Sequence, residues 1–392
     1  MAAVEADPIS FRSNLLAWYR AGRRDLPWRG TRDPWVVWVS EVMLQQTRVE
    51  TVRPRFSAFL VAFPTPAALA AATEETVLAH WSGLGYYERA RRLRRGASVV
   101  ADRPGGAFPR DPAAARSIPG VGPYTAAAVL SISFDLPYAV VDGNVARVLA
   151  RLHRLEPPHD RPGARTRRLA QALLDPVHPG DHNQAMMELG ALVCLPANPV
   201  CTATGTGRRR CPVAEHCRAH AAGMTQRYPA KRPRPAPVEV QARLFLLRDR
   251  KRRLLVERGN WQFLPRLWLP VIRPGAMEAP GAMDAPAALP TRFRVGVGSM
   301  REAGRVEHTI TKHRIRLRVF TGLVDPGRGP LPREYLLVTN AELAGLGRSS
   351  IVEKALRVER AAAAAARGGN VETVRPQRQG RRRLGSRTEI RR

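Results

Sequence analysis

The segment Ile118–Ala126 (IPGVGPYTA) constrains the fold of this chain more than any other feature. Its two glycines permit positive φ and close backbone approach, and Pro123 suits the first position of a following helix. The segment therefore predicts a tight turn that joins two helices, within residues 117–126. Amides exposed in such a turn form a binding site for an anion such as a DNA phosphate, here at Gly120, Val121 and Gly122.

A single carboxylate follows about twenty residues later, in the segment Val141–Asn144 (VDGN). Asp-Gly-Asn is good turn and helix N-cap chemistry, so Asp142 has a purely structural interpretation. The alternative is that Asp142 carries chemistry close to the anion-binding turn. The segment alone leaves both possibilities open.

A second carboxylate, Glu41, lies in a stretch that is otherwise apolar or amide-bearing (VSEVMLQQT). A helical glutamate usually faces solvent, but Trp35, Trp38, Val42 and Met43 make most of this helix apolar. A carboxylic acid in such surroundings has a raised pKa, which suits a general acid. Hydrolysis of a glycosidic bond needs one carboxyl group of this kind and a second that stays ionised.

Length and charge limit the class of protein. The chain has 392 residues, enough for two domains, and a formal net charge of +31. Such a charge favours binding to nucleic acid, although the dominance of Arg over Lys and the abundance of Ala also fit a GC-rich genome. No run is long enough to span a bilayer, and the acidic stretch Met1–Ser10 lacks a signal-peptide core. We expect a soluble, cytoplasmic bacterial protein that associates with the nucleoid through DNA.

All four cysteines fall in one short segment, with the spacing Cys-x6-Cys-x9-Cys-x5-Cys. Clustered thiols in a cytosolic protein bind a metal more often than they form disulfides. The cluster predicts a [4Fe–4S] centre, with zinc or no metal as the alternatives because the middle interval is long. The expected ligands are Cys194, Cys201, Cys211 and Cys217.

The pattern of the chain predicts four regions. Residues 1–227 have helical periodicity, with helices expected over 67–84, 125–132 and 183–193. Residues 228–239 form a Pro-rich basic linker. Residues 240–358 contain segments of strand character at 240–247, 254–257 and 314–323. Residues 359–392, an alanine run followed by Arg-rich sequence, are expected to be a disordered tail.

These motifs together resemble the helix-hairpin-helix DNA glycosylases of base-excision repair, and within them the MutY family of adenine DNA glycosylases. The resemblance covers about Leu15 to Tyr228. It implies a mostly α fold, with a six-helix barrel domain and an iron–sulfur helical domain, followed by a smaller α+β, Nudix-like domain. The motifs that carry it are LPWR at 26–29, SEVMLQQT at 40–47, GLGYY at 83–87, the turn at 118–126, VDGNVARVL at 141–149 and NQAMMELG at 183–190.

The resemblance implies catalytic roles for four residues. Glu41 would protonate N7 of the leaving adenine, and Asp142 would stabilise, or bond covalently to, the anomeric carbon that Asn144 orients. Endonuclease III-like enzymes carry an attacking lysine at the position of Tyr124, and a phenol cannot form that Schiff base. No lysine precedes Lys231, so we expect base release without strand cleavage.

The resemblance also implies a pocket and a wedge. Trp28, Arg29 and Glu188 would line the adenine pocket, and Gln46 and Tyr86 would insert into the base stack beside the lesion. The alternatives are that Trp28 and Tyr86 are core aromatics and that Glu188 is a surface charge.

The C-terminal region is similar to the Nudix-like domain with which the family recognises 8-oxoguanine. The aromatic and Pro-rich segment Asn260–Pro270 carries the likeness. Where the family has Phe-Ser-His, this chain has Ile310, Thr311 and Lys312, which keeps a hydroxyl but puts lesion discrimination in doubt. No acidic Nudix cluster is present, so nucleotide hydrolysis is not expected.

We therefore predict a monomeric adenine glycosylase acting on 8-oxoguanine:adenine and guanine:adenine mispairs in double-stranded DNA. One alternative is a mismatch glycosylase that removes thymine or another base. The other is a DNA-binding module without catalysis, which the presence of both Glu41 and Asp142 disfavours.

Overall fold

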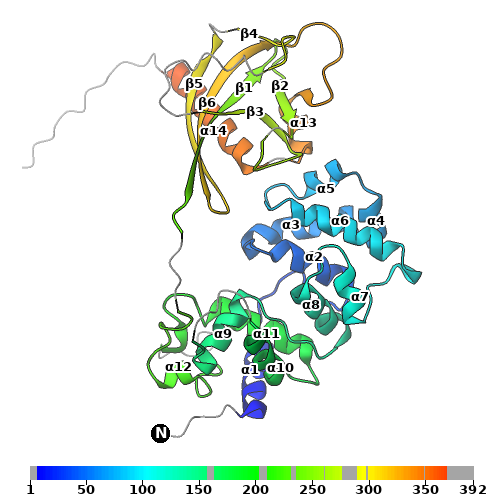
Figure 1. The fold of residues 1–392 in the computed structure, drawn as a ribbon, viewed down its shortest axis with the longest axis vertical. Coiled ribbons are helices and arrows are strands. Elements are labelled where there is room, and N and C mark those ends of the chain that lie inside the picture. Colours follow the sequence, from blue (N-terminus) through cyan, green and yellow to red (C-terminus); the bar gives the residue numbers. More distant parts are fainter. Residues whose placement is uncertain are drawn as a thin grey trace, which may run out of the picture.

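The computed structural model describes residues 7–156, 163–202, 210–230, 235–259, 261–275, 289–296, 299–347 and 349–368. A helical part is followed by a sheet-containing part, as Figure 1 shows. Of the linker expected over 228–239, residues 231–234 lie outside the described residues, and residues 238–239 belong to the first strand of the sheet. The predicted order, helical first and α+β second, is confirmed. None of the helices in these ranges is long and apolar enough to cross a lipid bilayer.

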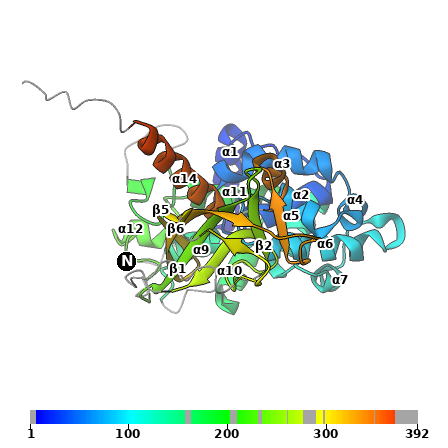
Figure 2. The same ribbon diagram turned by 90° about the horizontal axis from the view of Figure 1, so that it is seen from above.

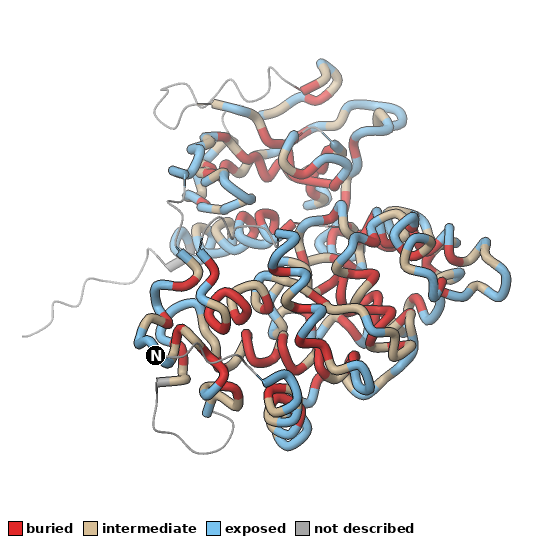
Figure 3. Tube along the Cα trace, turned by 60° about the horizontal axis from the view of Figure 1, so that its bottom comes forward, coloured by how far each residue is buried: buried red, intermediate tan, exposed pale blue. Residues whose placement is uncertain are grey.

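The helical part contains two hydrophobic cores. One lies among α2–α8 and continues into the C-terminal part, where it includes Leu244, Leu317 and Ile351. The other lies among α1, α9, α10 and α11 and extends to Cys217 and Tyr228. In Figure 3 the buried residues gather where the helices pack together, and exposed residues follow the outer turns. The helices are α1 (Pro8–Gly22), α2 (Pro34–Leu44), α3 (Val49–Ala62), α4 (Pro66–Ala71), α5 (Glu74–His80), α6 (Glu88–Ala101), α7 (Pro112–Ser117), α8 (Pro123–Phe134), α9 (Gly143–His153), α10 (Ala164–Leu173), α11 (Pro179–Leu192) and α12 (Arg218–Ala221).

Local capping explains where these helices begin. Asp33 caps α2 through the amide of Trp35, and Pro34 occupies the first turn, where no donor is needed. The helix expected over 67–84 is instead two helices. Thr73 accepts a hydrogen bond from the Thr76 amide, so it ends the first helical segment and starts α5. The helices expected over 125–132 and 183–193 correspond to α8 and α11.

The C-terminal part is a mixed sheet with the strand order β4-β6-β1-β3-β2-β7, and β5 pairs with β6. Strands β1 and β6 are parallel along their lengths, from Val238↔His313 to Arg248↔Leu323. The three predicted strand segments correspond to β1, β2 and β6. The bounds are β1 (Val238–Arg248), β2 (Leu254–Arg258), β3 (Trp268–Pro274), β4 (Arg294–Val295), β5 (Arg301–Ile310), β6 (His313–Asp325) and β7 (Tyr335–Val338), with α13 (Asn340–Gly345) and α14 (Ser350–Gly368).

Helix α14 corrects the expected tail boundary, because it continues through residues 359–368. Its first turns pack Ile351, Val352 and Ala355 against the sheet, and Glu359 pairs with Arg248 at 2.9 Å. The alanine run that follows has a high intrinsic helix propensity, so the helix continues beyond the sheet, as Figure 2 shows. The rest of the predicted tail, residues 369–392, lies outside the described residues.

The two parts meet at α5 and α6. Arg91 on α6 donates to the Pro265 carbonyl at 3.0 Å, and Arg258 on β2 pairs with Glu75 at 2.7 Å. The hairpin of β5 and β6 points back toward the helical part (Figure 1).

Candidate active site

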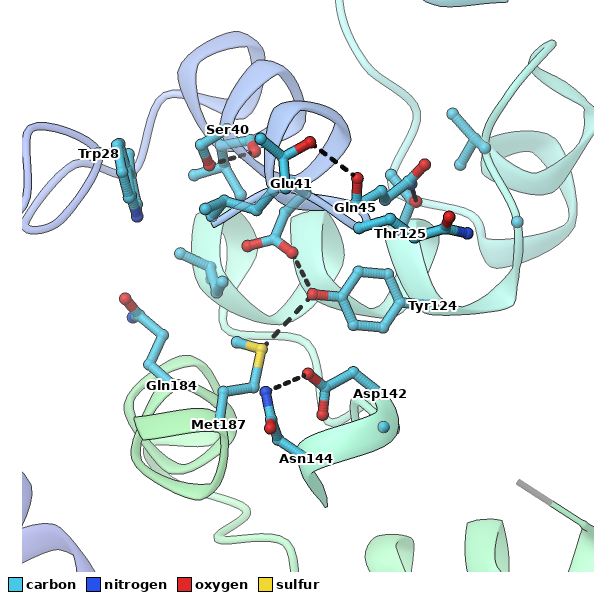
Figure 4. A pocket seen from close by; sticks show the side chains of 18 of the residues that line it. Trp28, Ser40, Glu41, Gln45, Tyr124, Thr125, Asp142, Asn144, Gln184 and Met187 are labelled. Carbon is cyan, nitrogen blue, oxygen red and sulfur yellow. Dashed lines mark hydrogen bonds between the residues drawn. The ribbon is translucent and has the colours of Figure 1, made fainter. Parts of the chain in front are cut away.

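The predicted catalytic residues come together around one cavity of about 1120 Å³ in the helical part. Its walls include the end of α2, the start of α8, the start of α9 and one face of α11 (Figure 4), together with the segment before α2 and the turn before α8. Among the predicted site residues, its lining contains Trp28, Arg29, Glu41, Gln46, Gly120, Val121, Gly122, Tyr124, Asp142, Asn144 and Glu188.

Glu41 lies on α2 with only 6% of its surface exposed. The hydroxyl of Tyr124 donates a hydrogen bond to its Oε2 atom (Figure 4). The pKa of Glu41 is raised to about 7: burial is the main cause and the charge of Asp142 adds to it, whereas the Tyr124 hydrogen bond and Arg29 oppose the rise. The solvated-face interpretation of Glu41 is wrong, and the carboxyl group can hold a proton near neutral pH.

Tyr124 stands in the first turn of α8, with its hydroxyl between Glu41 and the Met187 sulfur, which is 3.5 Å away. Burial and the two neighbouring carboxylates keep the pKa of this phenol well above its usual range. Tyr124 is therefore a neutral hydrogen-bond donor.

Asp142 is both the N-cap of α9 and a wall of the cavity, so its two interpretations are compatible. Its Oδ1 accepts from the Val145 amide at 2.7 Å, and its Oδ2 accepts from the Asn144 side chain at 3.1 Å. Burial raises the pKa of Asp142, and these hydrogen bonds oppose that rise. The hydrogen bonds favour the ionised form, whereas Glu41 receives only one.

Asn144 is itself oriented by Arg147, which donates to the Asn144 Oδ1 at 2.8 Å and to the Gly190 carbonyl at 2.8 Å. The amide oxygen is thus engaged, and the amide nitrogen faces Asp142 (Figure 4). Gly190 is needed at this crossing, because a Cβ there would lie 2.5 Å from the Asn144 Cβ.

Glu188 is buried, with 1% of its side chain exposed, and is held by two arginines. Arg24 binds both of its oxygens, at 2.9 and 2.8 Å, and Arg29 contacts Oε2 at 2.9 Å. Burial alone would raise the pKa of Glu188, but the Arg24 hydrogen bonds and the charges of both arginines lower it. The surface-charge interpretation of Glu188 is wrong. Trp28 is buried and packs edge-on against Phe56, yet it also lines the cavity.

The predicted turn joins α7 to α8 and also borders the cavity. Gly120 has φ of 84°, and a Cβ there would lie 2.9 Å from the Arg92 Cβ, so both space and backbone favour glycine. Gly122 differs from expectation, because its φ is −86° and it serves as the N-cap of α8. The positive φ is thus confined to one glycine.

Gln46 and Tyr86 are exposed at the ends of two loops, and both have left-handed backbone, with φ of 53° and 47°. Gln46 lines the first cavity. Tyr86, with 44% exposure, lines a second cavity of about 780 Å³ between the loop 83–87 and the sheet-containing part. Exposure excludes the interpretation of Tyr86 as a core aromatic.

Thr311 and Lys312 form the two-residue turn between β5 and β6. Thr311 has φ of 52° and lines the second cavity, as Tyr86 does. Lys312 is exposed and lines neither cavity. His313 packs its ring against Phe263, with 5.0 Å between centroids, so this imidazole belongs to the sheet. Asn260, at the start of the neighbouring aromatic segment, lies outside the described residues.

The four cysteines converge on one region beside α9. Burial, with a contribution from the other thiols, raises the pKa of Cys211 to about 12 and that of Cys217 to about 11. Arg151, itself buried, donates to the Cys194 sulfur at 3.2 Å. Burial alone thus favours the protonated thiols, but four neighbouring thiols beside a buried guanidinium are donors of the kind that bind a metal as thiolates. As placed, no three His, Cys, Asp or Glu side chains of the described ranges are grouped as metal ligands.

The cavity also contains side chains that were not predicted as site residues: Gln45, Gln184 and Met187. Helical spacing could have identified the two amides. Gln45 follows Glu41 by four residues, and Gln184 precedes Glu188 by four, so each shares a face with a predicted site residue. Arg24 carries no comparable local signal, because its partner Glu188 is 164 residues away in the chain.

Comparison with known proteins places these motifs in context. Residues 39–175 match the family model described as HhH-GPD superfamily base excision DNA repair protein. The chain is 47% identical to the adenine DNA glycosylase of Rattus norvegicus and 46% identical to that of Homo sapiens. Each alignment covers 55% of this chain; it covers 42% of the rat protein and 40% of the human protein. The chain thus spans less than half the length of these relatives.

Among solved structures, a thermostable thymine-DNA glycosylase is 28% identical, with a TM-score of 0.49. The match covers 55% of this chain and 97% of that chain.

Proposed function

We propose that this chain, which carries an HhH-GPD domain, is a monofunctional adenine DNA glycosylase. One observation carries the proposal: Glu41 and Asp142 share a cavity but have different surroundings. Glu41 is buried with a pKa of about 7, whereas Asp142 receives hydrogen bonds that favour its ionised form. Such a pair supplies the acid and the anion that hydrolysis of a glycosidic bond requires.

In this reaction the adenine must first leave the duplex and enter the cavity. Glu41 gives its proton to N7 of the base, so the base leaves as a neutral molecule while the C1′–N9 bond breaks. The ionised Asp142 stabilises the positive charge that develops on the sugar. Water then adds to C1′ and gives a proton to the Glu41 carboxylate, which restores the acid and leaves an abasic site. Tyr124, as a neutral donor, holds the Glu41 carboxyl group in place.

The paired Glu188 gives the pocket its fixed polar wall. Arg24 and Arg29 hold its carboxylate from two sides, so its oxygens keep one orientation. We propose that Trp28, Arg29 and Glu188 together recognise the extruded adenine. The combination of an apolar ring and a few fixed polar groups is typical of sites that bind small planar ligands.

The product should be an intact strand with an abasic site. Formation of a Schiff base with the sugar requires an amine, and the cavity presents Tyr124 at the position where related enzymes carry a lysine. No lysine precedes residue 231 in this chain. Strand cleavage by amine chemistry therefore has no nucleophile in the helical part.

We also propose that the four cysteines hold a [4Fe–4S] cluster, with zinc as the alternative. The residues would be Cys194, Cys201, Cys211 and Cys217, and the group would fix the chain between α11 and α12. Support comes from four buried or half-buried thiols in one region and from the Arg151 hydrogen bond to Cys194.

We propose that the substrate is double-stranded DNA with 8-oxoguanine:adenine or guanine:adenine mispairs, and that the protein binds it as a monomer. Thr311 and Tyr86 line the same cavity. If Tyr86 inserts into the base stack, the tip of the β5–β6 hairpin would lie beside the base that is paired with the adenine. Lys312 would contact the backbone phosphates at this tip.

The test measures base release from duplexes with a central 8-oxoguanine:adenine, guanine:adenine or guanine:thymine pair, with and without alkali. Breaks in the adenine strand that appear only after alkali are the expected result. Breaks without alkali would contradict the monofunctional mechanism. Release of thymine alone would assign the chain to a different branch of the superfamily.

A further inference from the structure

Arg89, in the first turn of α6, has no role in the proposed chemical step, yet its side chain contacts five main-chain oxygens. Its guanidinium group is half-buried between two loops that come from different parts of the chain. Burial lowers the pKa of Arg89 to about 10, so the group stays charged at neutral pH. Its two terminal nitrogens lie within hydrogen-bond distance of the carbonyl oxygens of Val42, Met43, Gln45, Leu84 and Gly85 and of the Thr47 hydroxyl.

The first of these loops is the end of α2, the helix that carries Glu41. The last carbonyl groups of a helix have no partner within the helix. Arg89 donates to Val42 O at 2.7 Å and to Met43 O at 2.9 Å, and thereby caps α2 from outside. A cation at a helix C-terminus also interacts favourably with the helix dipole.

The second loop is 83–87. The same guanidinium donates to Leu84 O at 3.1 Å and to Gly85 O at 3.2 Å, and it lies over the rings of Trp81 and Tyr86, 5.4 and 5.5 Å from their centroids. One planar cation thus binds both loops at once, as the fork geometry of arginine permits.

These two loops present the residues proposed as the wedge. Gln46 and Tyr86 both have positive φ, a backbone conformation that costs free energy in residues other than glycine and persists only where the surroundings fix it. The hydrogen bonds of Arg89 end at Gln45, immediately before Gln46, and at Gly85, immediately before Tyr86. The contacts therefore fix the backbone directly next to each strained residue.

We propose that Arg89 is a positioning residue that holds Gln46 and Tyr86 in one rigid wedge, so that base extrusion does not require the loops to order. This inference rests on the proposed glycosylase function. Binding energy that would otherwise order two loops is then available to unstack the base. Arg89 acts on extrusion and has no role in the chemical step.

The test compares single-turnover excision of adenine, at saturating enzyme, from two duplexes. In the first the adenine is normally stacked opposite 8-oxoguanine. In the second its neighbouring nucleotide is a tetrahydrofuran abasic analogue, so little stacking remains to be broken. Replacing Arg89 by alanine should slow excision from the first duplex about 10- to 100-fold and leave excision from the second within about twofold of the unmodified protein.

Arg55 provides the matched control. It donates to the Ser82 carbonyl at 2.8 Å and to the Thr51 carbonyl at 3.1 Å, so it supports the same loop without reaching α2. Arg55→Ala should keep the ratio of the two rates near that of the unmodified protein. Asp142→Asn should slow both duplexes alike, because it acts on the chemical step.

Several outcomes overturn the inference. If Arg89→Ala slows excision from both duplexes equally, the substitution causes a general structural defect. If both excision rates are unchanged, the wedge does not need this residue. Should Arg89→Ala be insoluble, Arg89→Lys decides, because its single ammonium group cannot bridge the two loops and should show the same selective loss. Absence of excision by the unmodified protein on both duplexes would instead refute the glycosylase function.

Discussion

Replacing Glu41 by glutamine should stabilise the protein at alkaline pH. The folded structure raises the pKa of this carboxyl group from its ordinary 4.5 to about 7, because the charged form is buried. The group therefore imposes no penalty on folding below its ordinary pKa. As the pH rises toward and through 7, the folded state must either keep a proton or bury a charge, and stability is lost. Glutamine keeps the acceptor for Tyr124 and has no charge to bury.

The size of the effect follows from the shift. One pKa unit corresponds to about 1.4 kcal/mol, so the penalty is about 3 kcal/mol at pH 8 and below about 1 kcal/mol at pH 5. The difference, roughly 2–3 kcal/mol, corresponds to a change in Tm of about 4–10 °C for a domain of this size. The expected observation is that the Tm gap between Glu41→Gln and the unmodified protein widens by that amount between pH 5 and pH 8.

The assay is thermal unfolding followed by far-ultraviolet circular dichroism at several pH values. Glu188→Gln is the matched control, because it removes another buried carboxylate from the same cavity. The arginines lower the pKa of Glu188, so its contribution is present above its ordinary pKa and is lost as the pH falls. The loss of Tm caused by Glu188→Gln, relative to the unmodified protein, should therefore be smallest at acidic pH. If the Tm difference between Glu41→Gln and the unmodified protein stays constant from pH 5 to pH 8, the conclusion that Glu41 is a buried, protonated acid is refuted.

Four further predictions concern catalysis, the metal centre and DNA binding. Asp142→Asn should reduce excision by about 10²–10³-fold or more while duplex binding, measured by gel shift, is retained; comparable loss of binding would contradict a purely catalytic role. Tyr124→Phe removes a hydrogen bond that lowers the pKa of Glu41, so the alkaline limb of kcat/KM against pH should move to higher pH, and a shift to lower pH would refute this assignment. Cys211→Ser should reduce the iron content of the purified protein, and iron-free unmodified protein that contains zinc would exclude the cluster. Lys312→Ala should weaken binding to all duplexes alike and reduce its salt dependence by about one unit of slope, whereas a selective loss for 8-oxoguanine would mean that the side chain reads the lesion.

Local features of this chain could be predicted from the sequence because their causes lie within a few residues. Asp33 and Pro34 start α2, and Gly122 and Pro123 start α8. The spacing of apolar residues around Glu41 predicted that this carboxylate would be buried. The expectation that the alanine run is disordered is wrong, because composition alone does not show that the preceding turns of α14 are anchored to a sheet.

The tertiary structure decided which of these features act together. Glu41 meets Tyr124 across 83 residues, and Arg24 meets Glu188 across 164. Arg89 reaches the carbonyl of Val42, 47 residues away. No local pattern encodes such pairs, because each depends on how separately formed helices pack. The sequence by itself determined where the capped helices begin and which side chains they carry. Packing determined the dielectric environment and the partners of those side chains, and hence which carboxyl group holds a proton and which is kept charged.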